Sequence, residues 1–245
     1  MPARAAIVLA AGKGKRMKSD LPKVLHEIGD QPMIRILMGT LVDLGLDRIV
    51  VVVGHKGELV QQALADFGVR TVWQREQLGT GHAVLQTEPL MADFDGTTLV
   101  AMGDVPFLSA QSINDLFEVH ERNRAAATCL SALVDDPSGY GRVVRDGNSD
   151  LMLEIVEHKD ASDEIKAIRE INSGTFCFDN GSLFAALKRV GNDNAQGEYY
   201  LPDTIKIMRG EGRRAAVVTA ADASEVLGVN SVDQLQDLAR RFGYA

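Results

Sequence analysis

The sequence is poor in cysteine and aromatic residues and has no long apolar run, and each shortage excludes a class of protein. Cys129 and Cys177 are the two cysteines in 245 residues, and they lie far apart in apolar surroundings. This spacing excludes a disulfide framework or a cysteine metal site and indicates buried free thiols in a reducing compartment, the cytoplasm. No apolar run approaches the ~18 residues of a membrane span, and the N-terminus reads as a strand rather than a signal peptide.

Basic residues are also fewer than acidic residues. The formal net charge is -8, with 26 basic against 34 acidic residues, which argues against non-specific nucleic-acid binding. Five histidines are scattered without metal-ligand spacing, and no Ser/His/Asp arrangement is visible. We therefore expect no nucleic-acid partner and no membrane partner, and a small-molecule ligand instead.

Short β-branched runs alternate with segments of helical period in the first half of the chain. This alternation predicts βαβ units and a largely parallel sheet. The expected strands are 5–10, 48–54, 69–74 and 97–104, and the expected helices are 33–45, 58–68 and 109–123.

The pattern changes after about residue 126, where strand-like pieces are joined by turn-rich links such as "DDPSGYG". These pieces predict antiparallel or mixed pairing added to the first half. The expected strands are 127–134, 141–146, 151–160 and 171–179, followed or interrupted by helices near 182–190, 198–210 and 231–242. The sequence predicts one mixed α/β domain over 1–245, with a nucleotide-binding half (1–125) and a second half (126–245) that closes over it.

An unusual cluster of cations follows the first expected strand, in "LAAGKGKRMKSDLPK" (9–23). Gly12 and Gly14 let the backbone turn sharply and bring N–H groups close to an anion. The cations are Lys13, Lys15, Arg16, Lys18 and Lys23. The dinucleotide pattern would need glycine at Met17, and the Walker spacing is absent. A solvated lysine-rich turn is the simpler reading, but so much charge at a strand end indicates a phosphate loop of another type.

This stretch resembles the L-A-A-G-x-G-x-R-M signature of the sugar-phosphate nucleotidyltransferases, with its following Pro-Lys. The continuation "LPKVLHEIG" is similar to the N-acetylglucosamine-1-phosphate uridylyltransferase branch. Further blocks agree in order along nearly the whole chain: "QLGTGHAV", "GDVP", "DDPSGYGRVVRD", "IVEHKDASDE", "EINSGTFCF", "NAQGEYYLPD" and "EVLGVNS". The resemblance implies a Rossmann-like nucleotidyltransferase fold that transfers UMP from UTP to N-acetylglucosamine 1-phosphate with Mg²⁺.

The resemblance also implies roles for individual residues. Arg16 would meet the outgoing phosphates and Lys23 the phosphates at the reacting centre, although a lysine at such a place is otherwise a surface residue. The nucleotide would be bound by Leu9, Ala10, Ala11, Gly12, Gln74, Gly79, Thr80, Met102 and Gly103. Gln74 would read the uracil edge.

Asp104 and Asn230 are the implied metal ligands. Asp104 follows a buried strand, where a carboxylate suits a cation better than a core, although a turn acid is the simpler role. Asn230 taken alone belongs to the N-cap region of the last helix. One carboxylate and one amide oxygen are a credible protein share for Mg²⁺, which keeps phosphate oxygens and water as its other ligands.

Gly141, Glu157, Asn172 and Tyr200 match positions that contact the N-acetylglucosamine moiety in the family. Taken alone, the first and third read as strand-end turns, and Glu157 as an exposed salt-bridge partner. The polar loop "NDNAQGEYYL" before and around Tyr200 is typical of a mobile cover over a ligand.

The chain departs from the family pattern at two places near the substrates, with Met102 where tyrosine is frequent and Pro202 where threonine is frequent. It also contains none of the hexapeptide repeats with which bifunctional members build a left-handed β-helix. We therefore expect uridylyltransferase activity alone, unless the chain is an excised fragment, and a monomer or small homo-oligomer. Two alternatives stay open: transfer to another hexose 1-phosphate or from dTTP, and a catalytically silent nucleotide-sugar sensor.

Overall fold

A single mixed sheet forms the centre of the computed structural model, which describes residues 2–17, 19–147 and 149–244. Its strands lie in the order β11–β7–β10–β6–β1–β4–β5, and β8 and β9 extend it beside β10. The bounds are β1 (Ala3–Ala10), β4 (Arg48–Val53), β5 (Arg70–Trp73), β6 (Gly96–Met102), β7 (Ala127–Leu133), β8 (Arg142–Arg145), β9 (Met152–Val156), β10 (Glu170–Asp179) and β11 (Ala215–Thr219).

The strand directions confirm a mixed and mostly parallel sheet. β1 runs parallel to β4 and β6, β4 parallel to β5, and β7 parallel to β11. β10 runs antiparallel to both β6 and β7, so it joins the strands of the first half to those of the second. The carboxyl ends of β1, β4, β5 and β6 therefore meet at one edge, where open α/β sheets bind ligands.

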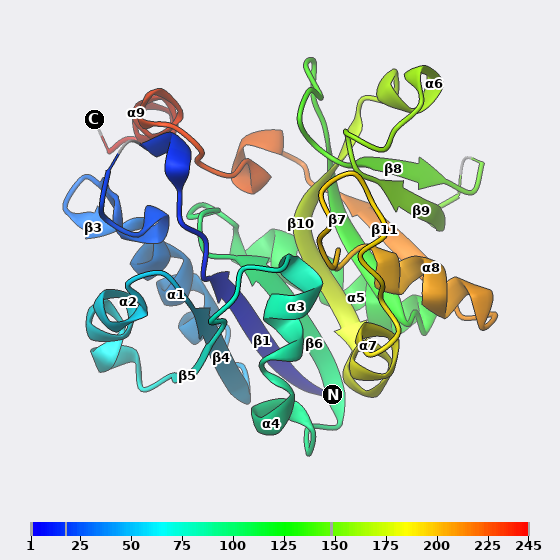
Figure 1. The fold of residues 1–245 in the computed structure, drawn as a ribbon, viewed down its shortest axis with the longest axis horizontal. Coiled ribbons are helices and arrows are strands. Elements are labelled where there is room, and N and C mark those ends of the chain that lie inside the picture. The colour runs from blue at the N-terminus through cyan, green and yellow to red at the C-terminus, as the bar shows by residue number, and fades with distance from the viewer. Residues whose placement is uncertain (1, 18, 148, 245) are drawn as a thin grey trace.

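Helices cover both faces of this sheet (Figure 1). One face carries α1 (Met33–Asp43), α2 (Gly57–Ala63) and α5 (Ala110–Asn123); the other carries α3 (Thr80–Leu85), α4 (Glu88–Met91), α7 (Asn180–Leu187) and α8 (Asp203–Gly210). Side chains of a strand alternate between its faces, so Ile7 and Leu9 pack with α3 while Val8 packs with α1.

A third, smaller cluster ties the C-terminal segment to the start of the chain. Met17, in the short helix η1 (Lys15–Met17), is buried with Val229 and with Leu238 of α9 (Val232–Arg241). The rings of Phe107 and Phe242 stack at 3.9 Å between centroids. Figure 1 shows α9 and the C-terminus beside β3 (Gln31–Pro32), which pairs with β2 (Glu27–Ile28), so the tail lies over the carboxyl edge of the sheet.

Most expected elements are present, two expected helices have different bounds, and some elements of the structure were not expected. The helix expected over 198–210 begins only at Asp203, because the backbone before it pairs with the 78–81 turn: Tyr199 N–H donates to Leu78 O and Gly81 N–H to Tyr199 O. The helix expected over 58–68 ends at Ala63 and continues as the turn η3 (Ala65–Phe67). Strand β11 and helices α3, α4 and α6 (Asp163–Lys166) were not anticipated.

The two cysteines are free and buried, as expected, and burial raises the pKa of both thiols. None of the helices in the described ranges is long and apolar enough to cross a membrane.

The buried amide of Asn180 joins β6 to the turn after α4, which generates a stability prediction. Asn180 accepts from Thr98 Oγ1 at 2.9 Å and donates to Met91 O and Phe94 O at 2.9 and 2.8 Å. We expect Asn180→Ala to lower the free energy of unfolding by about 3 kcal/mol, because the three buried hydrogen bonds of the Asn180 amide are lost. Urea unfolding measures this.

Asn123→Ala is the matched control, since Asn123 makes one bond to Val119 O at the end of α5. It should cost less than about 1 kcal/mol. Equal losses in the two variants would show that the Asn180 network does not stabilise the fold.

Candidate active site

The loop after β1 folds back onto the short helix η2 (Lys23–Leu25). Gly14 has a φ of +58°, and a Cβ built on it would lie 2.6 Å from the Lys23 Cβ. Both facts require glycine, because an L side chain rarely adopts that conformation and has no space there. Met17 N–H closes the turn on Gly14 O at 2.9 Å. The glycine predicted to shape a phosphate loop thus brings that loop against Lys23.

Four predicted functional residues meet beside this loop. The Lys23 ammonium contacts the Asp104 carboxylate and lies 2.9 Å from Asn230 Oδ1, to which Arg16 also donates at 2.8 Å. The Lys23 and Asp104 side chains are 16% and 13% exposed, so their attraction is only partly screened by water. A backbone bond from Val229 N–H to Asp104 O, 3.0 Å long, holds the tail against the end of β6.

The structure shows no comparable contacts for the other cations of the loop among the residues it describes. Lys13 is exposed and forms no ion pair with any residue the structure describes. Lys18 lies outside the described residues, and the Lys15 side chain is likewise not described. The predicted convergence of charge therefore depends on Arg16 and Lys23.

A cavity of about 220 Å³ opens next to this cluster, at the carboxyl edge of the sheet. Its lining includes most of the predicted nucleotide contacts: Leu9, Ala11, Gly12, Gln74, Gly79, Thr80 and Met102, together with Lys23 and Asp104. Gln77 and Glu198 also line it and were not anticipated. Ala10 and Gly103 do not, since the Ala10 side chain packs on the α1 face and Gly103 N–H donates to Leu9 O at 2.9 Å.

Three of the four predicted sugar contacts, Gly141, Glu157 and Asn172, lie together around the start of β8, and Tyr200 lines a cavity with Glu157. Asn172 N–H donates to Gly141 O at 2.8 Å, and a Cβ on Gly141 would lie 3.1 Å from Glu157 Oε1. The Asn172 Oδ1 accepts from Gly174 N–H, which leaves its amide nitrogen for a ligand. Tyr200 is 7% exposed, and its hydroxyl accepts from Gln196 Nε2 at 2.8 Å.

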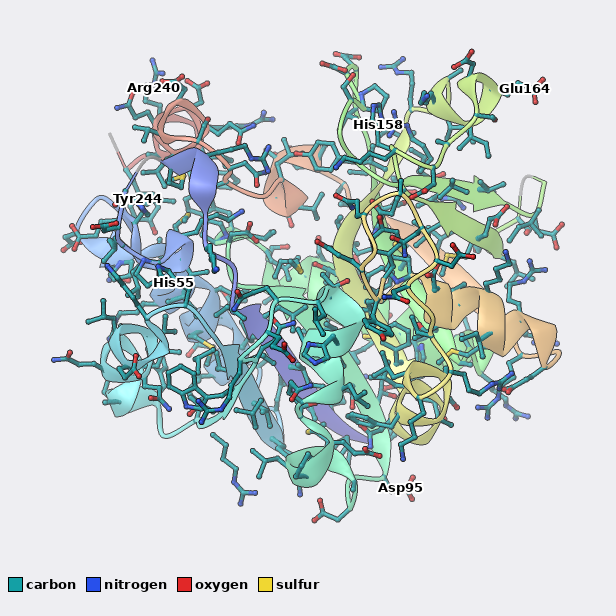
Figure 2. All side chains as sticks on the ribbon, in the orientation of Figure 1. His55, Asp95, His158, Glu164, Arg240 and Tyr244 are labelled. Carbon is teal, nitrogen blue, oxygen red and sulfur yellow. The ribbon has the colours of Figure 1, made fainter. Side chains whose placement is uncertain are left out.

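Glu157 and Tyr200 also line a larger, acidic cavity of about 440 Å³, together with Asp160 and Asp203. Burial, and then the neighbouring carboxylates led by Asp160, raises the pKa of Glu157. Burial also raises the pKa of Asp203. Arg189 and Lys206 are the basic side chains of the cavity lining and are outnumbered by the acidic ones, and carboxylates suit sugar hydroxyl donors. Figure 2 shows His158, the neighbour of Glu157, near β8, and Arg240 with Tyr244 on the opposite side of the molecule.

The sequence reading missed two residues that shape this region. Burial raises the pKa of Tyr140; the Asp104 carboxylate raises it further and the Arg16 guanidinium lowers it, so the phenol is near both charges. Arg142 is 1% exposed and donates to the carbonyls of Tyr140 and Ile168, which fixes the loop that carries Gly141. The "GYGR" stretch contained both, but nothing in its pattern indicated a buried arginine.

The donor set suits a hard divalent cation. Within the described residues no cluster of three or more His, Cys, Asp or Glu side chains could hold a metal. One Asp104 oxygen and the Asn230 Oδ1 lie close enough together to contact the same cation, the Lys23 ammonium. A carboxylate and an amide oxygen, completed by phosphate oxygens and water, match the preference of Mg²⁺.

The chain is similar to known proteins along most of its length. Residues 6–172 match the family described as MobA-like NTP transferase domain. The bifunctional protein GlmU of Heliobacterium modesticaldum is 48% identical over 237 residues, which are 97% of this chain and 51% of that protein. The bifunctional protein GlmU of Halalkalibacterium halodurans is 49% identical over 230 residues, 94% of this chain and 50% of that protein.

The chain thus spans about half the length of the curated relatives it matches. A solved structure of UDP-glucose pyrophosphorylase complexed with UDP-glucose superimposes with a TM-score of 0.77 and covers 98% of both chains. At 16% sequence identity this likeness shows the fold, a Rossmann-like nucleotidyltransferase fold, and confirms the expected fold class.

The raised pKa of Glu157 predicts a pH-dependent stability gain on its removal. The folded state binds the Glu157 proton more tightly than the unfolded state, so the ionised carboxyl costs stability above its folded pKa. That cost disappears as the pH falls below the unfolded pKa, where both states are protonated. We expect Glu157→Gln to raise the melting temperature by about 1–3 °C at pH 8, and by less at pH 4.5.

Glu164→Gln on the exposed helix α6 is the control, and it should leave the melting temperature nearly unchanged at both pH values. A Glu157→Gln protein that is less stable than wild type at pH 8 would contradict the burial argument.

Proposed function

Because the chain belongs to the family of MobA-like NTP transferase domains, we propose that it transfers UMP from UTP to N-acetylglucosamine 1-phosphate. The products are UDP-N-acetylglucosamine and pyrophosphate. The observation that carries the proposal is the meeting of Arg16, Lys23, Asp104 and Asn230 at the mouth of the 220 Å³ cavity.

The proposed reaction is an in-line displacement at the α-phosphorus of UTP. A phosphate oxygen of the sugar 1-phosphate forms the new P–O bond, while the bond from the α-phosphorus to the bridging oxygen breaks and pyrophosphate leaves. Two polyanions must approach each other, so positioning and charge neutralisation supply most of the catalysis. Lys23 would neutralise the phosphates at the reacting centre and Arg16 the outgoing pyrophosphate.

The base is selected by the side chain of Gln74. Its Nε2 donates to Gly79 O at 3.0 Å and contacts His82 Nδ1 at 3.1 Å, so the amide oxygen remains as an acceptor at the cavity. An acceptor pairs with the N3–H of uracil and repels the N3 lone pair of cytosine. Thymine also carries N3–H, so dTTP is the alternative nucleotide that this geometry supports.

The acceptor sugar would lie against Gly141, Glu157, Asn172 and Tyr200. Carboxylate and amide groups bind sugar hydroxyls and an acetamido group, and the absence of a side chain at Gly141 leaves space beside Glu157. The 192–201 segment contacts both sites, since Leu201 N–H donates to Thr80 Oγ1 at 3.1 Å. It links the nucleotide turn to the sugar contacts.

Asp104 and Asn230 would hold a divalent cation, which we propose is Mg²⁺. When bound, the ion would neutralise charge on the reacting phosphates. The Lys23 ammonium, released from these oxygens, would then donate to a phosphate oxygen. The two buried free thiols agree with a reducing compartment, and we propose the cytoplasm, with the protein acting as a monomer or small homo-oligomer.

The test of the proposed function is pyrophosphate release from UTP and N-acetylglucosamine 1-phosphate in the presence of Mg²⁺. We expect turnover in wild type and a loss of at least about 100-fold in Asp104→Asn, because the carboxylate neutralises the cation at the reacting phosphates. Asp95→Asn is the matched control: Asp95 is exposed at the far edge of the molecule in Figure 2, and its variant should keep wild-type turnover.

Three outcomes would contradict the proposal. A silent sensor would bind UDP-N-acetylglucosamine with equal, near-zero turnover in wild type and Asp104→Asn. A strong preference for glucose 1-phosphate would change the assigned sugar. A preference for dTTP over UTP would change the assigned nucleotide.

The contact of Lys23 with both proposed metal ligands makes a separate prediction about metal binding. A lysine cation competes with Mn²⁺ for the Asp104 and Asn230 oxygens, so Lys23→Met should bind Mn²⁺ without nucleotide about fivefold or more tightly than wild type. Turnover of the same variant should fall at least about 100-fold, because a phosphate contact is lost. Paramagnetic resonance of free Mn²⁺ measures the affinity.

Lys56→Met serves as the control for removing one positive charge, since Lys56 is exposed before α2. If Lys23→Met bound Mn²⁺ no better than Lys56→Met, then the ammonium would not share its oxygens with the metal.

A further inference from the structure

The side-chain amide of Gln74 is anchored through its nitrogen at two points. Gln74 is 4% exposed, and its backbone N–H donates to Val53 O at 2.8 Å, so its place at the end of β5 is fixed. Its Nε2 lies 3.0 Å from Gly79 O and 3.1 Å from His82 Nδ1. An amide nitrogen carries two hydrogens, and these two acceptors take both.

The two acceptors, Gly79 O and His82 Nδ1, restrict the Gln74 amide in different ways. The Gly79 carbonyl is an acceptor only, so it excludes the reversed amide, which would place two oxygens in contact. A single anchor would still let the amide plane rotate about the bond that attaches it. The His82 contact removes that freedom and fixes the direction in which the Gln74 oxygen points.

This contact also selects one tautomer of the imidazole. To accept at Nδ1, the neutral ring of His82 must carry its hydrogen on Nε2, which lies 3.1 Å from Gln86 Nε2. A neutral ring cannot accept from both amides. The Gln74 nitrogen is buried and donates to Gly79 O, so turning that amide would leave buried groups without partners. Gln86 Nε2 also donates to His82 O, at 3.1 Å, but this side chain is half-buried and the carbonyl keeps the Gln86 backbone N–H at 3.3 Å, so Gln86 can turn its oxygen toward Nε2–H at the loss of one hydrogen bond. The buried contact with Gln74 therefore determines the tautomer of the His82 ring, with the hydrogen on Nε2.

We propose that His82 is a positioning residue for base selection: it fixes the Gln74 amide so that an acceptor alone faces the cavity. The inference rests on the proposed function, since it assigns the reading of the N3–H group to Gln74. His82 is not among the residues that line the 220 Å³ cavity, so it acts through Gln74. Without it the amide rotates, and the cavity no longer separates an N3–H donor from an N3 lone pair.

The experiment compares UTP and CTP affinities by calorimetry without sugar phosphate, and kcat/KM with it. His82→Leu removes the acceptor, and we expect UTP affinity to fall about tenfold and the UTP-to-CTP ratio to fall with it. His82→Asn presents a side-chain oxygen near the place of Nδ1, so it should stay within about threefold of wild type. Gln74→Ala gives the reference for complete loss of base selection.

Gln86→Ala is the matched control, because it removes the other amide from the same ring and should leave the ratio unchanged. Should the leucine disturb folding, as judged by circular dichroism, His82→Ala removes the same acceptor.

An unchanged ratio in His82→Leu, or equal losses in His82→Leu and His82→Asn, would overturn the proposed role. A wild-type protein that binds UTP over CTP yet forms no UDP-sugar would contradict the proposed function alone, and the calorimetric ratios would still test His82. A wild-type protein with no preference for UTP would overturn the inference itself.

Discussion

The contact of the Lys23 ammonium with the oxygens of Asp104 and Asn230 is the interaction on which the site depends. It joins three segments that are far apart in the sequence: the loop after β1, the end of β6 and the turn before α9. Backbone contacts support the same arrangement: Val229 N–H donates to the main-chain O of Asp104 at 3.0 Å, and Asn230 Nδ2 donates to Gly228 O at 3.2 Å. The fold therefore holds a cation at this point, and the proposed metal would take the same place.

The fold explains how the distant segments reach each other. Parallel strands bring the carboxyl ends of β1 and β6 to one edge, and β10 joins the second half to the same sheet. The tail returns across that edge because Val229 and Leu238 are buried against Met17 of the loop after β1. This apolar packing needs no substrate, and it sets the geometry of the side chains that would contact the substrates.

Much of the fold was predictable from the sequence, and the part that was not has physical reasons. The apolar runs of β1 and β4 indicate strands covered on both faces, and the structure confirms them. Short elements such as α3 carry too few residues for a helical period to be visible. The helix expected from residue 198 starts five residues later, because backbone bonds to the 78–81 turn hold the preceding segment.

The candidate site also has a part that the sequence predicts and a part that it does not. Glycine, lysine and arginine in one loop indicate a phosphate site without any alignment, whereas the pairing of Asp104 with Asn230 required the family resemblance, since no local pattern connects them. The roles of Tyr140, Arg142 and His82 follow only from burial and hydrogen bonds. Sequence patterns report which groups can contact a ligand; side chains that orient those groups become visible only in three dimensions.

The most direct test of the central claim is a crystal structure of the protein with Mn²⁺ and a non-hydrolysable UTP analogue. The account predicts an anomalous peak about 2.2 Å from one Asp104 oxygen and from Asn230 Oδ1, with the Lys23 ammonium now on a phosphate oxygen. A peak bound elsewhere, or a triphosphate that lies away from the loop of Gly14, would contradict it.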